Sequence, residues 1–301
     1  MNALPKTGDL FATNQISPDT ERCYRYQLRN FAQWMETEQG KIELDDVTAV
    51  DLLTYKQSLS HLASSTQKRY MATIRSFFKW AQESGLITID PAAGVKLPRA
   101  IQDRTRVFFT LEETKALLQS IKPGRYAKRD LVMLWCFAHG LRVAETASLN
   151  VADVIQPENG GMAALRVRGK GSKERRVPLL MEGYKAIQDY LDDRDDAVDS
   201  NPLLVCTYSG DSTRRLSSSS IQERFGILAS HANIPESKRH PHAMRHGFAT
   251  RMLFEASVPG GIYTVSKLLG HSRVSTTEIY LHCSNKRLEQ AILADPLGAG
   301  V

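Results

Sequence analysis

The chain has 301 residues, 42% of them hydrophobic, and a formal net charge of +6 at pH 7. This length suits two domains, and this apolar share is enough to form buried cores, which excludes an intrinsically disordered protein. Most of the positive charge lies in residues 101–301, where 27 Lys and Arg oppose 22 Asp and Glu, and it is compatible with a polyanionic partner.

The first hundred residues are predicted to be helical. Ser17 and Pro18 are a typical helix start, because a serine oxygen can cap the first turn and a proline there needs no partner for its nitrogen. Apolar side chains then recur at helical spacing as far as Met35. Thr48 with Asp51 predicts the start of a second helix with a similar apolar face.

A third helix is expected from Ser65, with Gly85 as its stop. Its inward face is apolar and its outward face is basic. Such a face is either simply solvated or able to meet a polyanion. The basic residues on it are Lys68, Arg69, Arg75 and Lys79.

A domain boundary is predicted near residue 104. Pro91 and Pro98 frame an expected short helix, and the polar, basic stretch Pro98–Arg106 is suited to a linker. Thr110 with Glu113 then forms a capping box that starts a new helix. The sequence therefore predicts two domains, residues 1–104 and 105–301.

The second domain is predicted to mix helices with a small hairpin. A buried helix is expected at about Asp130–His139, and another from Val143. Ala163–Arg168 and Arg175–Leu179 alternate as strands do and flank Gly169–Gly171, which predicts a β-hairpin. The expected fold class is therefore mainly α with a small β-hairpin (α+β). Further helices are expected near Glu182–Arg194, Ser220–Ala232, His242–Phe254 and Thr264–Leu269.

Cysteine usage and the N-terminus point to a cytoplasmic protein. The four cysteines stand far apart and form no CxxC pair, which favours neither a zinc site nor a disulfide framework. The N-terminus has no apolar segment of signal-peptide length, and the longest apolar run, around Leu131–Ala138, is too short to span a bilayer. No membrane association is expected.

Five short segments place polar side chains beside apolar helices. Singly, four of them have an ordinary explanation: a surface arginine, a solvated basic turn, capping or core histidines, or a half-buried tyrosine. His242 and His246 are four apart, but a zinc-protease pair requires a glutamate directly after the first histidine, where Ala243 stands. The segments are GLRVAE (140–145), RVRGKGSKERR (166–176), HPHAMRH (240–246), LLGH (268–271) and STTEIY (275–280).

Taken together, in this order and spacing, these segments resemble those of the tyrosine recombinases, the integrase family of DNA strand-exchange enzymes. The resemblance is closest to the bacterial Xer-like branch. It extends into the first domain, where residues 64–92 (SSTQKRYMATIRSFFKWAQESGLITIDPA) are similar to the family's core-binding helices. It covers about Ser17–Leu293. It implies a helical core-binding domain followed by a catalytic domain, acting as a site-specific recombinase.

The resemblance implies a role for each polar segment. Tyr280 resembles the nucleophile that attacks the scissile phosphate and holds the 3′ end of the DNA. Arg142 and Arg245 would clamp the non-bridging phosphate oxygens, since a guanidinium is a planar fork that stays charged at any working pH. His271 would donate a further hydrogen bond to the same phosphate.

Two further roles concern protons. His242 resembles the group that accepts the tyrosine proton, and Lys170 the general acid for the 5′ oxygen. Glu145 is expected to orient the site. Neither cofactor nor metal is expected, because arginines neutralise the phosphate charge and the phosphotyrosyl bond conserves the energy of the broken phosphodiester.

Two segments depart from the family pattern. Gln156–Gly161 lengthens the approach to the hairpin, and Val258–Tyr263 lengthens the run that leads to the LLGH segment. Both are interpreted as loop insertions, which loops tolerate. They leave open which hairpin lysine reaches the phosphate, with Lys173 as the alternative to Lys170.

The implied partner is double-stranded DNA carrying recombination sites. The family acts as a tetramer that exchanges strands through a Holliday junction, here as a homo-tetramer or with a related recombinase. The C-terminal tail has an apolar stripe of Leu288, Ile292 and Leu293, which could dock on a neighbouring subunit or on its own core. The residues expected to contact DNA are Lys68, Arg69, Arg75, Lys79, Arg168, Lys173 and Arg175.

Two other readings fit the same sequence. One is a DNA-binding protein that has lost the chemistry, although no family catalytic position is visibly replaced. The other is a type IB topoisomerase-like enzyme, which relaxes DNA with the same residues but exchanges no strands between sites. The recombinase-like helices of the first domain argue against the second reading.

Overall fold

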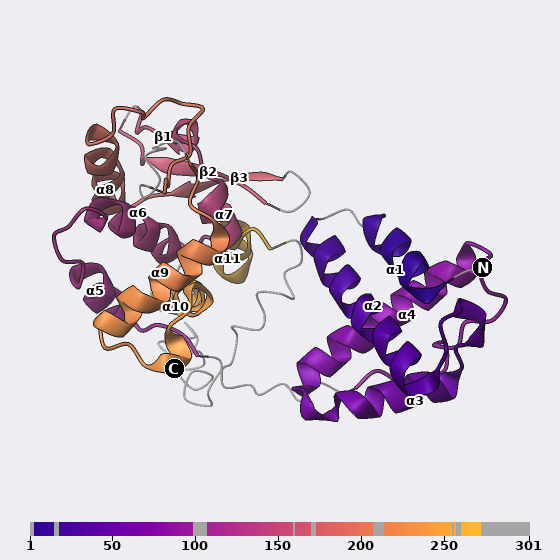
Figure 1. The fold of residues 1–301 in the computed structure, drawn as a ribbon. Helices are drawn as coiled ribbons and strands as arrows, with labels where there is room; N and C mark the ends of the chain where they lie inside the picture. The colour runs from indigo at the N-terminus through magenta and orange to yellow at the C-terminus, as the bar shows by residue number, and fades with distance from the viewer. Residues whose placement is uncertain are drawn as a thin grey trace, which may run out of the picture. The chain divides into compact units, whose positions relative to one another are not determined.

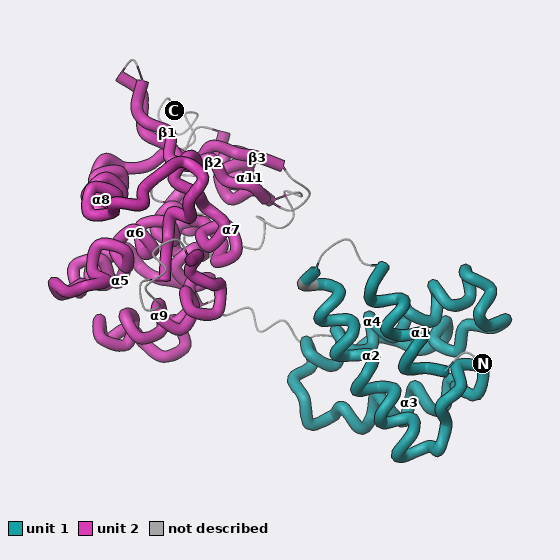
Figure 2. Tube along the Cα trace, turned by 45° about the horizontal axis from the view of Figure 1, so that its top comes forward, with its two compact units in different colours: residues 1–104 teal, residues 105–301 magenta. Residues whose placement is uncertain are grey.

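A computed structural model describes residues 3–14, 18–98, 107–158, 160–169, 173–206, 214–254, 256 and 260–271. The chain divides into two compact units, residues 1–104 and 105–301 (Figure 2). No helix among the described residues is both long enough and apolar enough to cross a bilayer.

The first unit is a helical bundle (Figure 1). Its core is rich in aromatic residues, with Phe31, Phe77 and Phe78 fully buried. The α1 helix packs on α2 so closely that a Cβ at Gly8 would lie 3.3 Å from the Cβ of Leu28. The helices are α1 (Leu4–Thr13), α2 (Pro18–Gln39), α3 (Ala49–Ser58) and α4 (Ser64–Glu83), with short 3₁₀ turns at Leu44–Asp46 and Leu59–His61.

Helix boundaries in this unit follow local chemistry. Thr48 caps α3 in a reciprocal box with Asp51, whose Oδ2 accepts from the Thr48 nitrogen at 2.8 Å. Pro18 begins α2, and Gly85, with a φ of +70°, follows the end of α4, as predicted. The prediction of a short helix between Pro91 and Pro98 is wrong, because residues 91–94 form a turn.

The second unit packs seven α-helices and a small sheet, counted over the described residues, around a small apolar cluster of Phe248, Ala249, Val265 and Leu269 and around a larger apolar core (Figure 1). Phe109, Phe137 and Phe225 lie at its centre with no exposed surface. The helices are α5 (Leu111–Gln119), α6 (Ala127–Ala138), α7 (Val143–Ser148), α8 (Met181–Asp192), α9 (Ser218–His231), α10 (Pro241–Phe254) and α11 (Gly261–Leu269).

The sheet is antiparallel, in the order β1-β2-β3. The predicted hairpin is confirmed as β2 (Ala164–Arg168) and β3 (Glu174–Pro178), and β1 (Val154–Ile155) is an additional edge strand. Val167 and Val177 point into the core, whereas Arg166 and Arg176 face each other on the exposed side. The predicted mainly helical α+β fold is confirmed.

Candidate active site

The turn after α6 places an arginine at the start of α7. Gly140 has a φ of +80°, and a Cβ there would lie 2.5 Å from a ring carbon of Phe248, so this turn requires glycine. Two residues later Arg142 occupies the N-cap of α7. Its backbone nitrogen donates to Oε2 of Glu145 at 2.8 Å, and its Nη1 donates to Oε1 at 2.7 Å.

A second arginine, Arg245, comes from α10 and is only 1% exposed. Its Nη1 donates to the carbonyl oxygen of Gly140, and its Nη2 donates to that of Leu269 at 2.7 Å. One guanidinium therefore joins the turn that ends α6 to the turn that ends α11.

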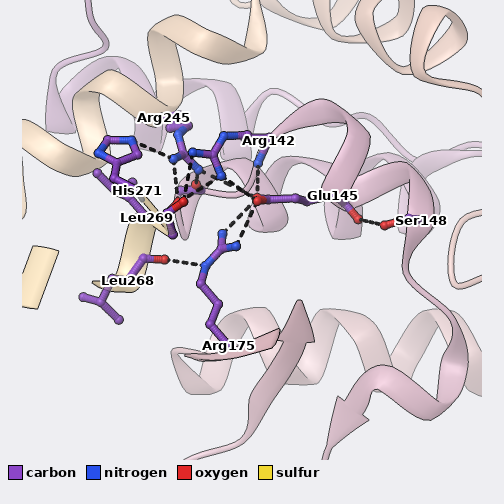
Figure 3. A network of polar contacts seen from close by, with 10 residues as sticks. Arg142, Glu145, Ser148, Arg175, Arg245, Leu268, Leu269 and His271 are labelled. Carbon is purple, nitrogen blue, oxygen red and sulfur yellow. Dashed lines mark hydrogen bonds and ion pairs between the residues drawn. The ribbon is translucent and has the colours of Figure 1, made fainter. Parts of the chain in front are cut away.

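Three guanidiniums donate hydrogen bonds to the C-terminal turn of α11, those of Arg142, Arg175 and Arg245 (Figure 3). Gly270 ends the helix with a φ of +64° and leaves its last carbonyl oxygens without helical partners. Arg142 donates to the carbonyl oxygens of Leu269 at 3.1 Å and Gly270 at 3.3 Å, and Arg175 donates to that of Leu268 at 2.8 Å. Cations are stabilised at this end of a helix because the helix dipole is negative there.

Glu145 lies between these cations and is 5% exposed. Burial alone would raise the pKa of its carboxyl, but hydrogen bonds and charge from Arg175, then Arg142, outweigh burial and lower the pKa to about 2. The carboxylate is therefore ionised at neutral pH and cannot act as a general acid. Its ionised oxygens are acceptors that fix the guanidiniums.

The cluster carries an excess of positive charge. Three guanidiniums surround the one carboxylate of Glu145. The side chain of Arg142 is 37% exposed, that of Arg175 12% and that of Arg245 1%. Arg142 is therefore the arginine most accessible to an anion such as a phosphate. Arg245 is buried, in surroundings of reduced dielectric where its charge acts more strongly.

His271 follows Gly270 and completes the cluster. Its Nε2 lies 3.1 Å from Nη2 of Arg245. Burial, followed by the charges of Arg245 and Arg142, lowers its pKa to about 4, so the imidazole is neutral at pH 7. Since a guanidinium can only donate, Nε2 is the acceptor of this hydrogen bond, and the proton of the neutral ring is placed on Nδ1.

His242 lies one helical turn before Arg245 on α10 and is exposed. Its ring is 4.5 Å from that of His246, centroid to centroid, in an edge-to-face arrangement. Of the residues predicted for the site, the structure thus brings together Arg142, Arg245 and His271 with Glu145, while Lys170, Tyr280 and the tail from Leu288 to Leu293 lie outside the described residues.

The residues predicted to contact DNA fall into two groups. Those on α4 and Arg168 and Lys173 on the hairpin are exposed, although Arg168 also pairs with Glu174 at 3.0 Å. Arg175 differs, because its side chain points into the cluster and not outward. Arg175 was predicted to contact DNA from the surface, but the structure shows its side chain largely buried against Glu145. The exposed residues on α4 are Lys68, Arg69, Arg75 and Lys79.

Among the described ranges, no group of three or more His, Cys, Asp or Glu is arranged to hold a metal ion. In the cluster itself the only carboxylate, Glu145, has its two oxygens engaged by guanidiniums and a backbone nitrogen.

Comparison with known proteins gives a consistent picture over both units. The Phage integrase family profile matches residues 107–287, and the profile of the phage integrase N-terminal SAM-like domain matches residues 7–85. Tyrosine recombinase XerC of Pelobacter propionicus is 35% identical over 91% of this chain and 87% of its own. Tyrosine recombinase XerC of Caldanaerobacter subterraneus is 32% identical over 93% of this chain and 82% of its own.

Two solved structures share the fold. The XerH site-specific recombinase in a post-cleavage complex with palindromic difH substrate has a TM-score of 0.72 at 22% identity, covering 91% of this chain and 79% of that one. The Tn1549 transposon integrase in complex with circular intermediate DNA has a TM-score of 0.72 at 19% identity, covering 97% and 99%.

Proposed function

The chain belongs to the phage integrase family and is a tyrosine-type site-specific recombinase, and on this basis we propose that it cuts and rejoins DNA through a 3′-phosphotyrosyl bond at Tyr280. The observation that carries the proposal is the cationic cluster at the end of α11. It holds the partly exposed guanidinium of Arg142 and the neutral imidazole of His271 at one helix end.

The proposed roles follow from this geometry and from the family's chemistry. Arg142 and Arg245 neutralise the non-bridging oxygens of the scissile phosphate, and the Nδ1 proton of His271 adds a hydrogen bond. Because the carboxylate of Glu145 already fixes Arg142, little reorganisation is needed when charge develops in the transition state.

The remaining roles concern proton transfer. The Tyr280 oxygen attacks the phosphorus while His242 accepts its proton, and Lys170, or Lys173 in its place, protonates the departing 5′ oxygen. Rejoining reverses these steps with a 5′ hydroxyl from the partner DNA. ATP is not needed, because the phosphotyrosyl ester conserves the energy of the cleaved bond.

We extend the proposal to the assembly. Four protomers, identical or paired with a related recombinase, hold two DNA sites and exchange strands through a Holliday junction, with the C-terminal tail contacting a neighbour. The basic face of α4 and the hairpin residues Arg168 and Lys173 contact the DNA backbone. In one of the two solved structures that share the fold, the XerH recombinase is bound to difH substrate.

The test uses DNA selected by the full-length protein from a random duplex library. A duplex nicked beside the cleavage point traps the covalent intermediate, since the short leaving strand diffuses away. The wild type should form an adduct and exchange strands between two sites, and Tyr280→Phe should bind the DNA without forming an adduct. A protein that binds without any adduct, or one that cleaves and never exchanges strands, would contradict the proposal.

A further inference from the structure

We propose that Arg175 is a positioning residue for the phosphate-binding cluster, which locks Glu145, and through it Arg142, to the C-terminal turn of α11 (Figure 3). This inference rests on the proposed function and deepens it. It gives Arg175 a role inside the site in place of a contact with DNA.

The strand pattern turns Arg175 inward. In β3, Arg175 and Val177 share the face toward the core, whereas Arg176 lies on the exposed face. An arginine on an apolar face is costly unless its charge is paired and its donors are bonded.

Arg175 meets that requirement through hydrogen bonds that connect its own strand, β3, to the helices α7 and α11. Its Nη1 and Nη2 donate to Oε1 and Oε2 of Glu145, both at 2.9 Å, in a bidentate pair. Its Nε donates to the carbonyl oxygen of Leu268 at 2.8 Å. A planar fork with three aligned donors can hold β3, α7 and α11 at once, which a single lysine ammonium cannot.

Gly270 provides a second observation. A Cβ at this position would lie 2.7 Å from Nη1 of Arg175 and 3.2 Å from its Cδ. The glycine therefore gives the turn its φ of +64° and also leaves room for the guanidinium. Arg175 therefore packs directly against the turn that precedes His271.

The consequence concerns the charge on Glu145. The groups that face its carboxylate are Arg142, Arg175, Arg245 and His271. Without Arg175 the carboxylate loses two hydrogen bonds while it stays buried, so its pKa should rise and its hold on Arg142 should weaken.

The experiment compares Arg175→Ala and Arg175→Lys with the control Arg176→Ala, which removes a neighbouring arginine from the opposite face of the same strand. For each protein we would measure the affinity for the selected duplex at several salt concentrations. We would also measure the single-turnover rate of adduct formation at saturating DNA between pH 5 and pH 8. Circular dichroism would report whether each variant folds.

Arg175→Ala should lower the adduct rate by about 10- to 100-fold with DNA affinity and its salt dependence unchanged. It should lose still more rate toward pH 5, where a protonated Glu145 no longer holds Arg142. Arg175→Lys, which keeps the charge, should restore the low-pH rate in part. Arg176→Ala should match the wild-type rate at saturating DNA.

Two results would overturn the inference. One is a drop in DNA affinity with a salt slope reduced by about one and no change in the saturated rate, which marks a phosphate contact. The other is a rate and a pH profile for Arg175→Ala equal to those of Arg176→Ala. If Arg175→Ala does not fold, Arg175→Lys decides by the same criteria. Absence of any wild-type adduct would instead reject the proposed function.

Discussion

The Nη2 of Arg245 lies 3.1 Å from the Nε2 of His271, and this contact determines which ring nitrogen carries the proton. Arginine is always a donor, so the free protein should hold His271 as the neutral Nδ1–H tautomer. Nitrogen-15 NMR of the imidazole should show this tautomer and a pKa of about 4. A His271 that titrates near 6.5 would contradict this arrangement of Arg245 and His271.

Removing the partly exposed guanidinium of Arg142 should lower the cleavage rate much more than the affinity for DNA. Arg142→Ala should reduce the rate of adduct formation by about 10²- to 10³-fold, because one charge stabiliser of the transition state is lost. DNA binding should be partly retained, since the basic face of α4 is untouched. Arg142→Lys should recover only part of the rate, because lysine lacks the bidentate fork. A wild-type rate in Arg142→Ala would exclude Arg142 from the phosphate site.

The turn before Arg142 should tolerate no side chain. Gly140→Ala should destabilise the second unit by about 2–4 kcal/mol, because it adds a Cβ in the left-handed region and against Phe248. Gly160→Ala is the matched control, since Gly160 has a similar φ of +77° and open space around it. It should cost only about 1 kcal/mol, the lower end of the range for backbone strain. Equal losses in urea unfolding would show that the contact with Phe248 is unimportant.

Acid should weaken the cluster in two stages. The pKa of His271 is about 4, below its usual 6.5, so its contribution is present above pH 6.5 and is lost as pH falls through 4. The pKa of Glu145 is about 2, below its usual 4.5, so its contribution, about 3 kcal/mol, is present above pH 4.5 and is lost as pH falls toward 2.

Urea unfolding between pH 7 and pH 2.5 would measure this dependence. In Glu145→Gln the loss of stability below pH 4.5 should be smaller than in the wild type, and in His271→Asn the loss between pH 6.5 and 4 should be smaller. Parallel curves for wild type and both variants would contradict the assigned shifts in pKa.

Much of the fold could be predicted because its signals are local. The capping pairs Thr48–Asp51 and Thr110–Glu113 mark the starts of α3 and α5, and both predictions are confirmed. The sequence does not predict the α1 helix, because two of its five buried positions hold Thr7 and Gly8, which weaken the apolar period. Gly8 is small because α2 packs against it, a contact that no local pattern reveals.

The site could be predicted only as a set of motifs. The family resemblance indicates Arg142, Arg245 and His271, but only the three-dimensional structure shows that they meet at the C-terminal turn of α11. For Arg175 a signal was present, since it alternates with the buried Val177. Its partner Glu145 is 30 residues away, so composition alone suggested a surface charge.

The proposed function depends on a covalent bond between the Tyr280 oxygen and DNA. Digestion of the trapped adduct with nuclease and protease, followed by tandem mass spectrometry, would locate the linked residue. A nucleotide 3′-phosphate attached to Tyr280 is the expected result. Attachment to any other side chain, or an adduct that persists in Tyr280→Phe, would refute it.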